Sequence, residues 1–338
     1  MKAPEFWWQQ SGIRAGLLSP LAALYGMVAD RPFGRGHVSD IPVLCIGNFV
    51  VGGAGKTPLA LALADRIMAH GGRPVFLSRG YGGTESGPYR VDIERDSARK
   101  VGDEPLLLAN QAPTFIAHDR IAALSAISAF GAADVIIMDD GFQSARIKPQ
   151  HAMLVIDAAR GLGNGQVLPA GPLRARLATQ ILHADSLVVL GYNDSRAPST
   201  DALIGRFHHL GKPVFDAMLA PQGPMMLEER VLAYSGIGDP EKFFRSLREG
   251  GMDVIHEVAF PDHHFFSQDD ARTLLDLAAG HQAALVTTAK DFARLRGETG
   301  ALARLAAVSH VFRIEVAFAQ PAAVDALLQT MEGSIRLC

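Results

Sequence analysis

The sequence predicts an α/β protein: a doubly wound, mostly parallel sheet, a second and smaller α/β domain, and a helix at the N-terminus. Three observations support this prediction. Short apolar runs that end in glycine or polar residues alternate with helical segments along the chain. The first of these runs leads into a glycine-rich loop that ends in Gly55-Lys56-Thr57. The pattern then breaks around residues 221–224, and a second α/β series begins.

The composition is that of a folded protein, with 338 residues of which 48% are hydrophobic and 20% charged. The net charge is −3 and no basic run stands out, so we expect no nucleic acid among the partners. The only cysteines are Cys45 and Cys338, which excludes a disulfide framework and favours a reducing compartment.

Residues 1–30 form the first predicted segment. Trp7 and Trp8 precede a mostly apolar stretch, residues 15–29, which Pro20 interrupts. This stretch is short for a membrane span. Tandem tryptophans beside a short apolar helix are typical of a segment that lies in the membrane interface. Taken alone, the segment fits equally well a helix that packs on the rest of the protein.

Residues 31–222 are predicted to form a P-loop domain. An apolar strand from Ile41 leads into the glycine-rich loop, and an apolar helix follows from Pro58 to Met68. Glycines let several backbone N–H groups point at one polyphosphate, and the helix adds its positive end. The residues expected to contact the nucleotide are Val51, Gly52, Gly53, Ala54, Gly55, Lys56, Thr57 and Pro58.

Within this loop, Lys56 suits the β/γ-phosphates and the Thr57 hydroxyl suits Mg²⁺. Val50 stands where the usual spacing has a glycine. The fold class is therefore a P-loop NTPase-type doubly wound sheet, with its site at the carboxyl ends of the strands.

The remaining elements follow from the same pattern. In the P-loop domain we expect a helix at Arg120–Phe130 and strands at Pro74–Leu77, Thr114–Ala117, Val135–Met138, Met153–Ile156 and Leu187–Leu190. The smaller domain is predicted over residues 223–338. It has a strand from Val231, a helix at Glu241–Arg248, and strands at Val254–Phe260, Ala284–Thr287 and Val311–Val316.

Two adjacent acids, Asp139 and Asp140, end the strand that begins at Val135. A strand that ends in aspartate delivers a carboxylate to Mg²⁺ beside the Lys-Thr pair. Asp-Gly also occurs in ordinary turns, but the Gly-Lys-Thr loop makes a metal site the stronger interpretation. Which of the two carboxylates faces the metal is left open.

Three further groups are weaker on their own. Asp103 and Glu104 could simply begin a helix. The Asp262-His263-His264 run suits either a base held by a carboxylate or a packing loop, and adjacent histidines are poorly spaced for a metal. Guanidinium groups match phosphate oxygens, and the candidate phosphate binders are Arg79, Arg120 and Arg174.

Taken together, the motifs resemble the tetraacyldisaccharide 4′-kinase family, the lipid A 4′-kinases of Gram-negative bacteria. The resemblance covers most of the chain in the family's order. Its motifs are LLSPLAALYG, GNFVVGGAGKTP, SRGYGG, GDEP, DDGFQ, the Asp157-Ala158 pair before GLGNG, LPAGPLR, SGIGDP, FPDHHFF and TTAKD.

The resemblance implies an ATP- and Mg²⁺-dependent enzyme that phosphorylates the 4′-hydroxyl of tetraacyldisaccharide 1-phosphate to give lipid IVA. It implies a monotopic protein on the cytoplasmic face of the inner membrane, with the N-terminal helix in the interface. Its lipid substrate and the membrane surface are then its partners.

The same resemblance assigns roles to residues. Asp103 is the base for the sugar hydroxyl, paired with His263 across the domain cleft, and Lys56 holds the β/γ-phosphates. Asp139 and Asp140 serve the metal and the phosphoryl group. The implied metal contacts are Thr57, Asp139 and Glu104, and Arg79, Arg120 and Arg174 are the candidate substrate contacts.

The chain departs from the family's pattern at a few positions. Ser144 stands where histidine is usual, Ala289 where glutamate is usual, and Ala175-Arg176 where an acid and proline are usual. These changes weaken any role assigned to Ser144, Ala289 or Ala175. The phosphate, metal and base positions are intact.

The alternatives are other P-loop proteins. A GTPase switch or metallochaperone-type NTPase of this branch often has a lysine where Val51 stands, and the guanine-reading Asn-Lys-x-Asp tetrad is absent from the sequence. A soluble ATP-dependent ligase leaves the tryptophan-rich start unexplained. A dinucleotide dehydrogenase is excluded because no strand leads into G-x-G-x-x-G with a following ribose-binding acid.

Overall fold

The chain folds around three sheets in this computed structural model, which describes residues 3–191, 195–223, 227 and 229–333. The largest sheet has nine strands in the order β15-β10-β9-β8-β2-β6-β3-β5-β4. Its strands are β2 (Val43–Asn48), β3 (Pro74–Ser78), β4 (Tyr89–Arg90), β5 (Thr114–Ile116), β6 (Val135–Asp139), β8 (His151–Asp157), β9 (Ser186–Leu190), β10 (Val214–Pro221) and β15 (Ile314–Phe318). Edge strands β15 and β4 are antiparallel to their neighbours and the other pairs are parallel.

Helices cover both faces of this sheet because successive strand residues point to opposite sides. Along β2, Val43 and Cys45 join one core and Leu44 and Ile46 join the other. The first core includes α5 (Arg120–Phe130), α6 (Leu177–His183) and α7 (Pro198–His209). The second includes α2 (Lys56–Ala69), α4 (Asp103–Ala109) and α12 (Pro321–Gly333). The predicted doubly wound α/β fold is confirmed.

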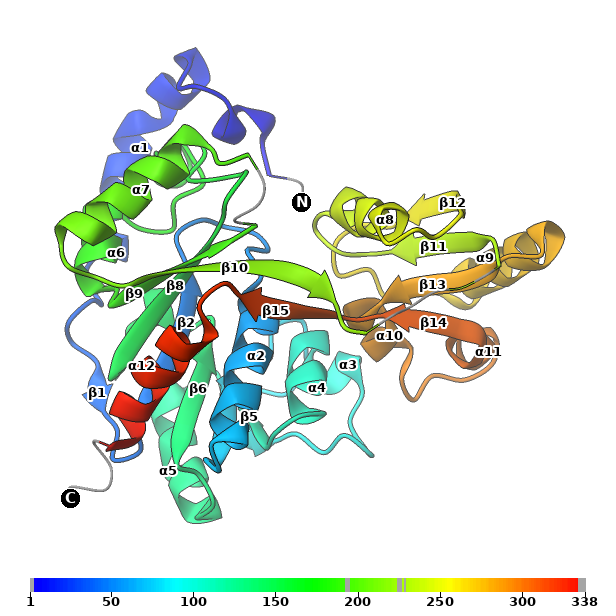
Figure 1. Cartoon of the computed structure of the whole chain (residues 1–338), viewed down its shortest axis with the longest axis horizontal. Coiled ribbons are helices and arrows are strands. Elements are labelled where there is room, and N and C mark those ends of the chain that lie inside the picture. The colour runs from blue at the N-terminus through cyan, green and yellow to red at the C-terminus, as the bar shows by residue number, and fades with distance from the viewer. Residues whose placement is uncertain (1–2, 192–194, 224–226, 228, 334–338) are drawn as a thin grey trace.

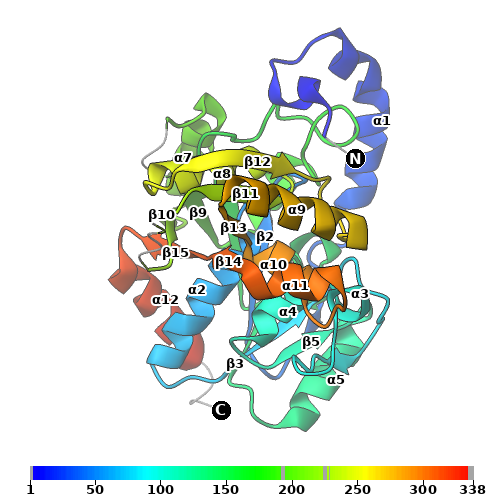
Figure 2. The same cartoon turned by 90° about the vertical axis from the view of Figure 1, so that its right-hand side faces the viewer.

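A smaller parallel sheet lies beside the larger one (Figure 1). Its strand order is β12 (Val254–Ala259), β11 (Val231–Ser235), β13 (Ala284–Thr288) and β14 (Ser309–Phe312). Helix α8 (Pro240–Glu249) packs on one face, and α9 (Gln268–His281) and α11 (Ala301–Val308) pack on the other. Helix α10 (Ala289–Leu295) follows β13 and lies next to α4 of the larger unit (Figures 1 and 2).

The C-terminal end of the chain differs from the prediction of one strand over Val311–Val316. The structure divides that run at Arg313, because β14 ends at Phe312 and β15 pairs antiparallel with β10. Apolar residues continue across both strands, so hydrophobicity gives no sign of the division. The smaller domain was predicted to reach residue 338. Instead, β15 joins the nine-stranded sheet and α12 packs into the core on one face of that sheet.

The remaining elements are short. A two-stranded parallel sheet joins β1 (His37–Val38) to β7 (Ile147–Lys148). A helical turn α3 (Ala98–Val101) precedes α4, and a 3₁₀ turn η2 (Phe142–Ser144) follows β6.

The N-terminal segment consists of a 3₁₀ turn η1 (Glu5–Trp8) and α1 (Ile13–Ala29). Both tryptophans contact the protein: Trp7 Nε1 donates to the carbonyl of Pro169 at 3.0 Å, and Arg160 lies 3.8 Å over the ring of Trp8. They are half-buried, so the exposed apolar surface of this segment comes from α1 instead.

Helix α1 buries its small residues and exposes its large ones. Ala15, Ala22 and Gly26 face the protein. The exposed large apolar side chains are Ile13, Leu17, Leu21, Leu24, Tyr25, Met27 and Val28. Among the helices that the structure describes, none combines the length and the apolar character needed to cross a membrane.

Candidate active site

The loop between β2 and α2 is held in a fixed shape. The buried Asn48 donates its side-chain amide to the carbonyls of Val50 at 2.7 Å and Gly52 at 3.2 Å. Gly55 precedes α2 with a φ of +80°, and a Cβ there would meet Leu190 Cδ1 at 2.4 Å, so this position requires glycine. In the described chain no side chain caps α2, which leaves the amides of its first turn available to an anion.

Thr57 and Asp139 meet at the carboxyl end of the central strands. Thr57 Oγ1 donates to Asp139 Oδ2 at 3.2 Å. The other carboxylate oxygen, Asp139 Oδ1, is buried and has no hydrogen-bond partner among the described residues. Burial, reinforced by Glu104, raises the pKa of Asp139 to about 7. A buried oxygen without a partner is a ready ligand for a cation.

Asp140 is surrounded by cations. Lys56 Nζ lies 3.7 Å from its Oδ1, and Arg174 Nη1 donates to the same oxygen at 2.7 Å. Arg120 Nη2 donates to the Asp140 carbonyl at 3.1 Å. Burial disfavours the charged carboxylate, but Lys56 and Arg174 outweigh it and hold the pKa of Asp140 below its usual value. Burial lowers the pKa of Lys56.

The three predicted phosphate-binding arginines therefore have different surroundings. Arg120 and Arg174 converge on Asp140 beside the phosphate loop, and Arg120 Nη1 is buried without a partner among the described residues. Arg79 is exposed and lines the same cavity as the other two.

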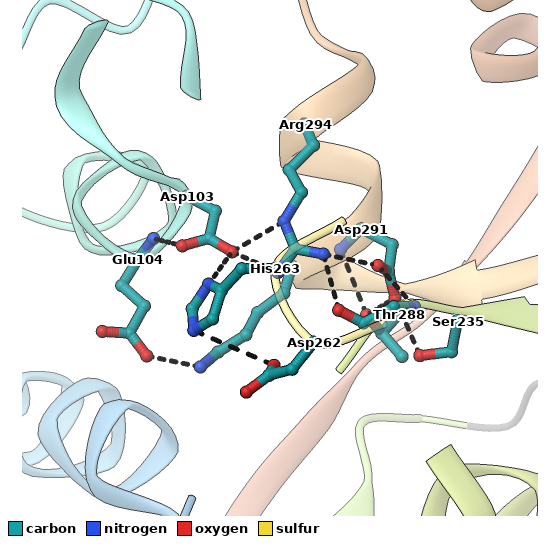
Figure 3. Close-up of polar contacts among 10 residues, drawn as sticks. Asp103, Glu104, Ser235, Asp262, His263, Thr288, Asp291 and Arg294 are labelled. Atoms are coloured by element: carbon teal, nitrogen blue, oxygen red, sulfur yellow. Dashed lines mark hydrogen bonds and ion pairs between the residues drawn. The ribbon is translucent and has the colours of Figure 1, made fainter. Parts of the chain in front are cut away.

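A second cluster joins the two sheets (Figure 3). Asp103 begins α4, and its Oδ2 lies 3.4 Å from His263 Nδ1 in the smaller unit. The structure thus brings together the pair that the resemblance implies. Arg294 Nε donates to the same Oδ2 at 2.8 Å, and Oδ1 accepts the backbone N–H of Glu104 at 2.9 Å.

The charges of this cluster reinforce one another. Burial opposes ionisation of Asp103, but His263 and Arg294 outweigh it and hold the pKa of that carboxyl well below its usual value. The hydrogen bond to Asp103 in turn raises the pKa of His263. Glu104, a predicted metal contact, instead pairs with Lys290 of α10 in this structure.

A cavity of about 3090 Å³ opens between the two units and is lined by residues from both groups. Lys56, Thr57 and Asp139 line it from the larger sheet, and His263 and Lys290 line it from the smaller unit. Asp103 is only 4% exposed and does not line it. The imidazole of His263 is therefore the part of the pair that faces the cavity.

Among the contacts between the units that sequence reasoning missed, two involve residues around the cavity. One is the buried Arg294, whose partner Asp103 is distant in sequence. Its signal was available: Lys290 lies four positions before Arg294, which places both cations on one face of a short helix. The other is the ion pair of Asp157 with Lys242, in which Nζ and Oδ2 are 2.9 Å apart.

Known proteins are similar to this chain over nearly its full length. The sequence matches the family described as tetraacyldisaccharide-1-P 4′-kinase over residues 14–332. It is 46% identical over 338 residues to the tetraacyldisaccharide 4′-kinase of Rhizobium meliloti (strain 1021), which covers 99% of this chain and 96% of that protein. It is 47% identical over 335 residues to the enzyme of the same name from Sinorhizobium fredii (strain NBRC 101917 / NGR234). That match covers 97% of this chain and 95% of that protein.

A solved structure agrees with these relatives. The crystal structure of the "apo" form of LpxK from Aquifex aeolicus in complex with ATP superposes with a TM-score of 0.72 and 25% sequence identity. The match covers 94% of this chain and 99% of that one. The family match and the near full-length relatives together favour a kinase over the switch and metallochaperone alternatives. The chain belongs to the tetraacyldisaccharide-1-P 4′-kinase family.

Proposed function

We propose that this protein transfers the γ-phosphoryl group of ATP to the 4′-hydroxyl of tetraacyldisaccharide 1-phosphate, which gives lipid IVA in lipid A biosynthesis. One observation carries the proposal: the phosphate loop of the larger unit and His263 of the smaller unit, which pairs with Asp103, line one cavity. Family membership supplies the substrate, because relatives that match nearly end to end bear this name.

ATP occupies the phosphate loop in this proposal. The uncapped first turn of α2 and Lys56 provide the positive charge that a triphosphate needs. The related Aquifex aeolicus structure was solved with ATP. Arg120 and Arg174 lie close enough to the loop to add charge around Asp140, and Arg79 is the remaining candidate for the acceptor's 1-phosphate.

Mg²⁺ fits the residues at the end of β6. The unpartnered Asp139 oxygen and the Thr57 hydroxyl are hard oxygen ligands, and they would hold the ion. Within the described residues no cluster of three or more His, Cys, Asp or Glu side chains could hold a metal. Mg²⁺ is usually bound by one or two carboxylates together with the substrate's phosphates. The ion would neutralise charge on the transferring phosphoryl group.

The Asp103–His263 pair accepts the proton of the sugar hydroxyl. Because His263 lines the cavity and Asp103 does not, we propose His263 as the group that takes the proton, in place of the Asp103 base that the resemblance implies. Its Nε2, which lies 3.8 Å from Asp262 Oδ1, would accept the proton while Nδ1 donates to the Asp103 carboxylate. Asp103 orients the ring and stabilises its positive charge. Drawing the pair from both units makes catalysis depend on their contact, which limits wasteful hydrolysis of ATP.

The exposed face of α1 suits a substrate anchored by acyl chains. Leu17 is 76% exposed and Ile13 84% exposed, and the neighbouring apolar side chains continue the surface. An apolar face of this kind binds in the plane of a membrane interface. We infer a peripheral, monotopic protein on the cytoplasmic face of the inner membrane.

The test is direct. Incubation of the full chain with ATP, Mg²⁺ and the disaccharide 1-phosphate lipid in mixed micelles is expected to add one phosphate to the lipid, read by mass spectrometry. Lys56→Ala is expected to lower turnover at least ~100-fold, since it removes a charge from the transferring group. Lys148→Ala, which removes an exposed lysine of β7, is the matched control and should keep full activity. Turnover retained by Lys56→Ala would remove the phosphate-loop assignment.

A further inference from the structure

The guanidinium of Arg294 touches three groups at once (Figure 3). Its side chain is 1% exposed. On one side, Nε and Nη2 both donate to Asp103 Oδ2, the former at 2.8 Å. On the other side, Nη1 donates to the carbonyl of Gly236 and to Asp291 Oδ1, each at 2.8 Å.

The Gly236 carbonyl links Arg294 to the other half of the catalytic pair. That oxygen also accepts the backbone N–H of His263 at 3.0 Å. His263 has a φ of +58°, a conformation that a non-glycine residue adopts only when its surroundings hold it. One guanidinium therefore contacts the Asp103 carboxylate directly and the backbone of His263 through a shared carbonyl.

Asp291 holds the side of the Arg294 guanidinium that does not contact Asp103. It is fully buried, and its Oδ1 accepts both Arg294 and the N–H of Gly236, at 2.8 and 2.9 Å. Its Oδ2 accepts the hydroxyls of Ser235 at 2.9 Å and Thr288 at 2.6 Å. These donors come from the ends of β11 and β13, so Arg294 is anchored to the strands of the smaller sheet.

We infer that Arg294 is a positioning residue for phosphoryl transfer: it holds the Asp103 carboxylate and the His263 loop in register across the two units. The inference rests on the proposed function of that pair. A planar guanidinium can donate in three directions within one plane, whereas a lysine ammonium cannot reproduce that fork. The orientation of the pair, and not merely a positive charge, therefore depends on Arg294.

The kinetic test uses Arg294→Lys, which keeps the charge and removes the fork. We expect kcat to fall about 10–100-fold, as for misplaced reacting groups, while KM for ATP stays within about 2-fold. Arg296→Lys is the matched control. Arg296 ends the same helix and contacts Asn110 and Glu94 of the larger unit without touching the pair, so kcat should not change.

A double-mutant cycle separates positioning from general packing. In the Asp103→Asn background, Arg294→Lys should lower the residual kcat by a smaller factor than in the wild-type background, because the carboxylate that it orients is already gone and only its contact with the His263 loop is lost. An equal loss in both backgrounds, or a rise in KM for ATP that matches the loss of kcat/KM, would overturn the inference. So would a wild-type kcat for Arg294→Lys.

A second measurement does not require an Arg294 variant to fold. In ¹⁵N spectra of the full chain, Asp103→Asn should shift the Arg294 Nε–H resonance and leave that of Arg296 in place. An unmoved Arg294 signal overturns the inference. If the wild-type protein fails to phosphorylate the lipid but the Arg294 signal shifts, the proposed function is wrong and the contact between Arg294 and Asp103 is confirmed.

Discussion

At the residue scale, Asp139 shows how a buried carboxylate opposes folding. Its carboxylate is buried, and one oxygen has no partner among the described residues. The pKa rises from 3.8 to about 7, so the folded protein holds this proton more tightly than the unfolded chain. A carboxyl group whose pKa is raised by folding stabilises the folded protein at pH values below its pKa in the unfolded chain. That stabilisation is lost as the pH rises through about 7.

Asp139→Asn should therefore stabilise the protein at pH 8 without Mg²⁺, by a few degrees in Tm, and much less at pH 5. Each kcal/mol corresponds to roughly 2–4 °C in a large domain. Calorimetry with a chelator at both pH values measures the difference. Asp157→Asn is the control and should instead lower Tm at pH 8. Burial disfavours the Asp157 carboxylate, but Lys242 outweighs it and holds the pKa of Asp157 below its usual value. A less stable Asp139→Asn at pH 8 would contradict the argument.

The catalytic pair makes a second prediction at this scale. Asp103→Ala and His263→Ala should each reduce kcat about 10²–10⁴-fold, the range of general acid–base catalysis. The double variant should be little worse than the worse single one, since the two side chains share one hydrogen bond. Steady-state kinetics on all three variants test it, and fully multiplicative losses would mean that they act independently.

These residue roles were only partly accessible from the sequence. The Gly-Lys-Thr loop and Asp139 follow from local patterns, because a strand, a loop and a helix in order define the chemistry. Asp103 and His263 required the family resemblance, since a Gly-Asp-Glu-Pro turn has an ordinary explanation as a helix start. Arg294 was not predicted, because its role comes from Asp103, a residue of the larger unit that lies 191 positions away in the sequence.

At the scale of the element, α1 reverses the usual arrangement of an amphipathic helix. It packs through alanine and glycine and presents leucines to solvent. A soluble helix buries its large apolar side chains because each contributes about 1.5–3 kcal/mol. Their exposure over several turns supports our proposal that this face lies in a membrane interface.

The triple variant Leu17→Ser, Leu21→Ser and Leu24→Ser should reduce partition onto anionic vesicles at least ~10-fold, because it removes three buried leucines from the bound state. Tm should change little, since the side chains are exposed in the folded protein. Leu182→Ser with Leu210→Ser, exposed leucines on other helices, is the control and should still bind. Vesicle sedimentation measures both, and unchanged binding of the triple variant would contradict the membrane role.

The sequence pattern predicted most of the interior elements closely. Helix α5 spans the predicted Arg120–Phe130, and β3, β6 and β9 differ from prediction by about one residue at an end. Buried parallel strands are easy to recognise because they are short, apolar and bounded by glycine or acids. Strand β10 was missed because the edge-proximal run from Val214 alternates buried and half-buried residues.

At the scale of the whole molecule, the nine-stranded sheet is completed by the end of the chain. Helix α12 packs on α2 and contributes Val324 and Leu328 to the same core. Long-range closure of this kind has no local sequence signal, which is why the end of the smaller domain could not be predicted.

Leu328→Ala should therefore destabilise the larger unit by about 2–4 kcal/mol, because Leu328 is buried beside α2 and its removal leaves a cavity. Both tryptophans, Trp7 and Trp8, contact the larger unit, so fluorescence during urea unfolding reports it. Leu210→Ala, at an exposed leucine, should change the unfolding free energy by less than about 0.5 kcal/mol. Equal effects of the two variants would place α12 outside the core.

The pairing of Pro221 with Ile314 has a topological consequence. Those residues are paired on neighbouring antiparallel strands, so the intervening residues 222–313 begin and end at the same place on the nine-stranded sheet. Adjacent antiparallel strands are ordinarily joined by a tight hairpin turn. The smaller unit is thus an insertion at a hairpin tip, and excising it would leave the strands of the larger sheet and its phosphate loop intact while removing His263, the partner of Asp103.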